Sequence, residues 1–175
     1  MDELQLVPLD PRHAEAVADY RAAFAPDRPR VTWNPESVPG LDGLERYESA
    51  ADWIRACGEM TGKVSWFLTV RRSDGRVIGA LCLRHRLEYD EDDEEFASHI
   101  GYSVRPDERG RGYGVEQLRL GLGAARALGL ERVRLVCRDA NLASRRVILK
   151  NGGVFLDALY GEESGMTVLR YDIPL

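Results

Sequence analysis

Residues 104–115 read Val-Arg-Pro-Asp-Glu-Arg-Gly-Arg-Gly-Tyr-Gly-Val, and they are the most informative part of the chain for predicting its fold. Glycine stands at every second position, at Gly110, Gly112 and Gly114, which predicts a tight turn whose backbone a bulky anion can approach. Apolar residues recur at helical spacing from Val115 onward, so we expect the turn to open an amphipathic helix. The first turn of a helix offers unpaired N–H groups and a favourable dipole. The stretch therefore predicts a phosphate site.

Arg109 and Arg111 add positive charge at this turn, and a diphosphate is the ligand that fits it best. Two other glycine motifs do not fit. A Walker A loop needs Gly-Lys-Ser/Thr, and the only two lysines of the chain are Lys63 and Lys150. A dinucleotide fingerprint needs a third glycine where Val115 stands. The structural alternative is a glycine-rich surface turn with basic side chains on it.

Outward from this turn, hydrophobic periodicity and turn residues predict seven strands and four helices. The expected order is β-α-α-β-β-β-α-β-α-β-β, an α/β (α+β) fold with a mixed, mostly antiparallel central sheet flanked by helices. We expect the crossover between residues 97 and 137 to be parallel and right-handed. The expected strands are 4–9, 65–71, 77–84, 96–104, 133–137, 154–159 and 166–171, and the expected helices are 10–24, 44–57, 112–129 and 141–150.

The composition is that of one globular domain over residues 1–175, with 44% hydrophobic and 30% charged residues. The net charge of −5 excludes a broad basic surface for nucleic acid. The chain contains no apolar run long enough for a membrane span and begins with no signal-like segment, so we expect a cytoplasmic protein without a membrane partner. The three cysteines are far apart and form no CxxC pair, so we expect neither a metal site nor a disulfide framework.

At this point the sequence resembles the GNAT superfamily of N-acetyltransferases, which use acetyl-CoA. The family pattern Arg/Gln-x-x-Gly-x-Gly/Ala is met by Arg109, Gly112 and Gly114, after a matching Val-x-Pro at residues 104–106. Residues 141–152, Asn-Leu-Ala-Ser-Arg-Arg-Val-Ile-Leu-Lys-Asn-Gly, resemble the asparagine-led helix of the family. His-Ile-Gly-Tyr-Ser-Val-Arg-Pro and Lys-Asn-Gly-Gly-Val further resemble a subgroup known mainly as predicted acetyltransferases. The resemblance covers about residues 65–160.

The resemblance implies a binding site for acetyl-CoA as cosubstrate. Backbone amides from Gly110 to Val115 would hold the diphosphate, and the strand end at residues 102–104 would pair with the pantetheine arm. Asn141 would contact the arm from the neighbouring helix, and the acetyl group would lie between the strands ending at Val104 and Cys137. The implied cofactor-binding residues are Tyr102, Ser103, Val104, Arg109, Gly110, Arg111, Gly112, Tyr113, Gly114, Val115, Asn141 and Ser144.

The resemblance identifies the catalytic groups less directly than the cofactor-binding residues. His99 stands where some relatives carry a glutamate facing the substrate, and an imidazole can accept a proton near neutral pH, so we predict it as the base. The alternative is a histidine that is only hydrogen-bonded in a half-buried strand. Many members carry a tyrosine as general acid seven positions after the asparagine, but Ile148 stands there. Other candidates for the acid are Tyr102, Tyr160 and Tyr171.

We expect direct transfer of the acetyl group to a primary amine of a small molecule. The alternatives are a protein or peptide acceptor, and a non-catalytic acyl-CoA sensor, which Ile148 keeps open. Trp33 in the proline-rich stretch is a candidate for the acceptor pocket, and the acidic run 88–95 is either a lure for cationic amines or a solvated hairpin end. We expect Cys137 to be a core thiol, and a homodimer is compatible with the resemblance.

Overall fold

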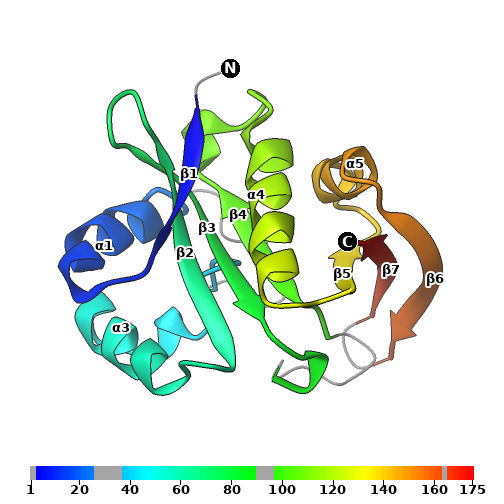
Figure 1. Ribbon diagram of the computed structural model, residues 1–175, viewed down its shortest axis with the longest axis horizontal. Helices are drawn as coiled ribbons and strands as arrows, with labels where there is room; N and C mark the ends of the chain where they lie inside the picture. The colour runs from blue at the N-terminus through cyan, green and yellow to red at the C-terminus, as the bar shows by residue number, and fades with distance from the viewer. Residues whose placement is uncertain (1–2, 26–36, 90–96, 163–164) are drawn as a thin grey trace.

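The computed structural model describes residues 3–25, 37–89, 97–162 and 165–175. The α/β prediction is confirmed, and the strands and helices of the described residues follow the expected order (Figure 1). The strands are β1 (Leu4–Pro8), β2 (Val64–Arg71), β3 (Val77–Arg84), β4 (Ile100–Val104), β5 (Arg132–Arg138), β6 (Val154–Gly161) and β7 (Met166–Pro174). The helices are α1 (Ala14–Ala22), α3 (Ala50–Glu59), α4 (Tyr113–Ala127) and α5 (Leu142–Lys150).

The strands form two sheets rather than one. A four-stranded sheet has the order β1-β2-β3-β4, and a three-stranded sheet has the order β5-β7-β6. Every strand pair recorded within these sheets is antiparallel. The expected strand 96–104 begins only at Ile100, and His99 just before it donates its N–H to the Arg134 carbonyl of β5. The sheet is therefore divided between β4 and β5.

Alternating side chains on β3 and β4 separate two hydrophobic cores. Leu81 and Ile100 face α4 and share a core with β5 and β7, while Ala80 packs with α1 and α3 on the opposite face. Figure 1 shows the same layers: α1 and α3 lie on one side of the four-stranded sheet and α4 lies on the other. Each face of β4 thus meets a different environment.

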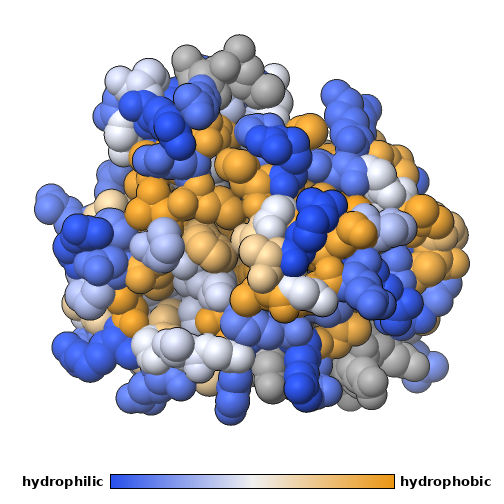
Figure 2. Space-filling view, in the orientation of Figure 1, coloured by the Kyte–Doolittle hydropathy of each residue, from blue (hydrophilic) through white to orange (hydrophobic). Residues whose placement is uncertain are grey.

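The edge strand β6 carries apolar side chains into solvent. Val154, Phe155 and Leu156 are between 42% and 56% exposed. In Figure 2 hydrophobic residues accordingly gather at the right-hand edge, where Figure 1 places β6. Among the described residues, no helix has the length and apolar character needed to cross a bilayer.

Candidate active site

The glycine turn is built as the sequence predicts. Gly110 and Gly112 have φ angles of +79° and +85°, which an L side chain rarely adopts. Gly112 is the N-cap residue of α4, and among the described residues no side chain caps this helix. By contrast, Ser49 caps α3 with its hydroxyl group. The start of α4 therefore presents its helix dipole to an approaching anion, while the Val115 N–H itself donates to the Gly112 carbonyl at 3.1 Å. A Cβ at Gly110 would meet only open space. These features fit a diphosphate.

The arginines of the turn have protein partners. Arg109 donates from Nε to the carbonyl oxygen of Val104 at 3.2 Å, and its guanidinium lies 5.6 Å from the centroid of the Phe24 ring. Arg111 pairs with Glu108 at 3.1 Å. Both side chains thus hold the turn, so a diphosphate would be bound chiefly by backbone amides, with the arginine charges close by.

Glu108 is the anchor of the turn, and sequence reasoning did not single it out. Its side chain is 1% exposed and accepts from Arg76 at 2.7 Å and from Arg71 at 3.3 Å, in addition to Arg111. Arg71 also donates to the Tyr113 hydroxyl at 3.3 Å. This network ties the β2–β3 hairpin to the glycine turn and to the first residue of α4.

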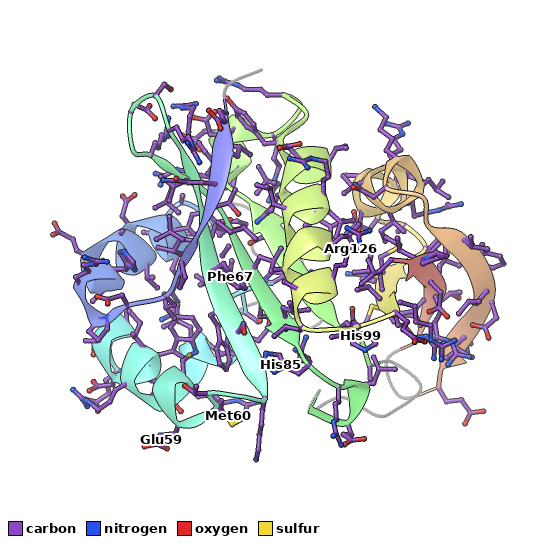
Figure 3. The ribbon with its side chains drawn as sticks, viewed as in Figure 1. Glu59, Met60, Phe67, His85, His99 and Arg126 are labelled. Carbon is purple, nitrogen blue, oxygen red and sulfur yellow. The ribbon has the colours of Figure 1, made fainter. Side chains whose placement is uncertain are left out.

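β4 and β5 meet at one point and form no ladder with each other. The His99 N–H donates to the Arg134 carbonyl at 2.9 Å, and the Arg134 N–H donates to His99 Nδ1 at 2.9 Å. In Figure 3 His99 lies toward the end of α4 that is remote from the glycine turn. We call the end of the two strands at which His99 and Arg134 bond the closed end. A solvent-exposed, polar cavity of ≈ 660 Å³ lies there, lined by His85, Arg86, Leu87, Glu88, His99, Glu131, Arg132 and Arg134. Toward Val104 and the glycine turn β4 and β5 are not paired, and this unpaired stretch is the gap between the two strands.

His99 is in a poor state to act as a base. Burial, and next the charge of Arg134, lower its pKa to about 4, so the imidazole is neutral at pH 7. Because Nδ1 already accepts the Arg134 N–H, the proton of the neutral ring sits on Nε2, where no lone pair is left for an incoming proton. The predicted base role stays a prediction, and these contacts favour the alternative, a hydrogen-bonded joint between the two sheets.

Replacing His99 distinguishes a base from a joint. Asparagine offers an acceptor oxygen close to the position of Nδ1, so we expect His99→Asn to keep the acetylation rate and its dependence on pH from 6 to 9. His99→Leu leaves the Arg134 N–H unsatisfied and is expected to cost about 1–3 kcal/mol of unfolding free energy. Urea titration and initial rates measure both effects. Loss of rate in both variants, with a flattened pH profile, would instead support the base.

Replacing His99 should also change how the unfolding free energy depends on pH below neutrality. A histidine with a folded pKa of about 4 binds protons more readily when unfolded, where its pKa is 6.5. Its contribution to stability is therefore complete above pH 6.5 and declines as the pH falls toward 4. We expect His99→Asn to lose this part of the acid dependence, which unfolding curves from pH 7 to 4 measure.

At the end of the gap nearer the glycine turn, two hydroxyl groups from β4 and α5 form a pair beside the gap. The Tyr102 hydroxyl on β4 lies 3.0 Å from the Ser144 hydroxyl on α5. Asn141 accepts the Ser144 N–H on its side-chain oxygen at 3.0 Å and so caps α5. Burial raises the pKa of the Tyr102 phenol, although the bond to Ser144 opposes the shift, so the phenol is protonated at neutral pH. The structure thus brings Tyr102, Asn141 and Ser144 together beside the gap.

The remaining predicted residues divide between core, surface and the other face of β4. Tyr171 and Ile148 are buried in the core, and Tyr160 is 64% exposed on β6, so Tyr102 is the tyrosine of the candidate set that faces the gap. Cys137 is buried, and burial raises the pKa of its thiol to about 11. Ser103 points to the α1 side, where its hydroxyl donates to the Pro39 carbonyl at 2.6 Å.

Two sequence hypotheses fall outside the described residues. Trp33 lies there, and so does most of the acidic run 88–95, of which only Glu88 and Tyr89 are described. Trp53 and Trp66 pack edge to face in or against the α1/α3 core. In the described part of the chain, no group of three or more histidine, cysteine, aspartate or glutamate side chains is arranged to hold a metal ion.

Comparison with known proteins agrees with this architecture. A spermidine N-acetyltransferase variant from Vibrio cholerae superposes with a TM-score of 0.69 at 15% identity, over 97% of this chain and 94% of its own. An acetyltransferase from Salmonella typhimurium that modifies the N-terminal serine of ribosomal protein L7/L12 gives 0.71 at 17% identity, over 98% and 95%. The microcin C7 self-immunity acetyltransferase, in complex with acetyl-CoA and AMP, gives 0.75 at 14% identity, over 100% and 94%.

Sequence comparison assigns the family. No curated protein sequence matches the chain significantly. A family model described as an acetyltransferase (GNAT) domain matches residues 3–154, which is most of the chain and includes the glycine turn and α5. The chain therefore belongs to the GNAT acetyltransferases, the enzymes that use acetyl-CoA as acetyl donor.

Proposed function

We propose that this enzyme transfers the acetyl group to a primary amine of a small molecule. One observation carries the proposal: the segment Val38–Gly43 crosses the α1/α3 face of β4, where Ser103 bonds to Pro39 and Asp42 reaches over Gly101. A nitrogen that approaches β4 from this face must pass beside the segment, which favours a slender acceptor over a broad protein surface.

A protein N-terminus is the second candidate. It is supported by the likeness to the acetyltransferase that modifies the N-terminal serine of L7/L12. At 17% identity, this likeness concerns the fold alone. A peptide N-terminus is itself a primary amine on an extended chain, so it presents the same reacting group.

The chain's own groups supply binding and proton transfer. Bound acetyl-CoA supplies an activated acyl group as a thioester. The turn from Gly110 to Val115 would hold its diphosphate, and the strand end at Tyr102, Ser103 and Val104 would align its arm. A new C–N bond forms while the C–S bond breaks, so the nitrogen must give up a proton and the sulfur must gain one. The Tyr102–Ser144 hydroxyl pair lies beside the gap, and this position supports a role for the pair in donating the proton to the sulfur.

The transfer itself is tested by thiol release. The purified protein is incubated with acetyl-CoA and, in turn, spermidine, tyramine and a short peptide with a free N-terminal serine, with product masses measured. Acetylation of the small amines at much higher kcat/KM supports the proposal, and a preference for the peptide supports the second candidate. Tight acetyl-CoA binding without turnover would support a sensor.

Ser144→Ala tests the hydroxyl pair. We expect kcat to fall by about 10²-fold, the lower end for loss of a positioned proton donor, because Tyr102 then lacks its partner. The KM for acetyl-CoA should stay within a few-fold. Ser98→Ala is the matched control, since Ser98 donates to the Ile100 carbonyl at the closed end of the gap. An equal kcat in both variants would contradict the role.

A further inference from the structure

The segment from Val38 to Gly43 is fixed on the sheet in a single position. Gly40 has a φ of +89°, and a Cβ at this residue would clash with the carbonyl group of Ala80 on β3. One residue earlier, the Pro39 carbonyl accepts the Ser103 hydroxyl of β4. The backbone of this segment therefore lies directly against both β3 and β4.

This placement holds the Asp42 carboxylate beside Cys82 and Arg84 of β3. Oδ2 accepts from Arg84 Nη2 at 2.9 Å and from Cys82 Sγ at 2.8 Å. Oδ1 accepts the Gly40 N–H at 3.3 Å, and the main-chain carbonyl accepts Trp53 Nε1 at 3.1 Å. Burial, and next the charge of Asp42, raise the pKa of the Cys82 thiol, so this thiol is protonated and donates.

The carboxylate lies over Gly101, the second residue of β4. Asp42 Oδ2 is 3.1 Å from the position that a Cβ on Gly101 would occupy, and only glycine at that position leaves room for it. Gly101 stands between His99, which joins the sheets, and the strand end at residues 102–104, which the proposed function assigns to the coenzyme arm. Asp42 is on the face opposite to Tyr102. An acceptor that arrives from the α1/α3 face would thus meet Asp42 on the strand whose end the proposed function assigns to the coenzyme arm.

The carboxylate has capacity for one more donor. A carboxylate offers about four lone-pair sites, and among the described residues three donors reach Asp42. Its side chain is 34% exposed, whereas Arg84 is 12% exposed. Arg84 and Cys82 thus occupy Oδ2 from the protein side. Oδ1 accepts only the longer hydrogen bond from the Gly40 N–H among the described donors, so it can accept one more donor.

The geometry points to Asp42 as the residue that binds the acceptor amine, with Arg84 as its positioning residue. This inference rests on the proposed function. A primary amine is mostly an ammonium ion at neutral pH, and it presents N–H donors and a positive charge to Oδ1. Asp42 thereby selects cationic amines and sets their nitrogen over Gly101 of β4.

Asp42→Asn keeps the shape of the side chain and removes its charge. With spermidine and tyramine as probes, we expect the KM for the amine to rise at least tenfold, while the KM for acetyl-CoA stays within twofold. Gly101→Ala is a second variant, and it keeps every charge. Its Cβ would press on Asp42 Oδ2 and Cys82 Sγ and would therefore shift the carboxylate. It should raise the KM for the amine in the same way.

Asp52→Asn is the matched control. Asp52 lies on α3 in the same layer, and its side chain is 46% exposed and paired with Arg55 at 2.9 Å. The control loses the same charge, and both KM values should stay at those of the wild type.

The outcomes separate the two proposals. If the wild type acetylates a probe amine but Asp42→Asn leaves the KM for the amine unchanged, the inference fails alone. If Asp42→Asn raises both KM values equally, Asp42 only stabilises the fold and the inference also fails. If the wild type acetylates no probe amine, the proposed function fails and this inference fails with it.

Discussion

Glu108→Gln is expected to lower the unfolding free energy by about 3 kcal/mol, the lower end for breaking a buried ion pair. The carboxylate is 1% exposed and serves Arg71, Arg76 and Arg111 together, so the substitution leaves three guanidinium groups with a neutral partner. Arg71 keeps Asp74 at 2.6 Å, which limits the cost. Urea titration measures the change.

The same variant should weaken coenzyme binding. Arg111 belongs to the glycine turn and is tied to the β2–β3 hairpin only through Glu108 among the contacts described for its side chain. Once that tie is lost, the turn samples more conformations, and we expect the KM for acetyl-CoA to rise about tenfold, which is about 1.4 kcal/mol.

The neighbouring Asp107 provides the control for Glu108. Its side chain is 54% exposed and pairs with Arg76 and with Arg105. Asp107→Asn should cost at most about 1 kcal/mol, since exposed ion pairs contribute little. If the two variants unfold at the same urea concentration, Glu108 is not the anchor of the turn.

The second large effect is expected for Gly112→Ala. A left-handed backbone costs an L residue about 1–2 kcal/mol, and relief of that strain would turn the first amides of α4 away from their common direction. We expect the Kd for coenzyme A, measured by calorimetry, to rise more than tenfold. This result would support backbone amides as the diphosphate ligands.

Gly129→Ala separates strain from binding. Gly129 has a φ of +82° at the other end of α4, and a Cβ there would meet open space. The variant should lose comparable stability yet bind coenzyme A as the wild type does. Equal Kd values in Gly112→Ala and Gly129→Ala would place the diphosphate elsewhere.

Local pattern was sufficient for the turn and the elements around it. The glycines at 110 and 112 adopt the left-handed conformations that their lack of a Cβ permits, and α4 begins at Tyr113 as the change of period predicts. These features depend on dihedral preferences and on side-chain spacing within about one helical turn, and both can be read directly from the sequence.

Local sequence patterns were therefore enough to predict the α/β fold, the element order and the glycine turn before α4 of this GNAT acetyltransferase. The packed fold was needed to show that the two sheets are joined at His99 and Arg134, that Glu108 is buried beneath three arginines, and that Asp42 reaches over Gly101. The reason is that each of these contacts joins residues about 30 or more positions apart or depends on a third element. No local propensity encodes which polar groups the packed strands bring together.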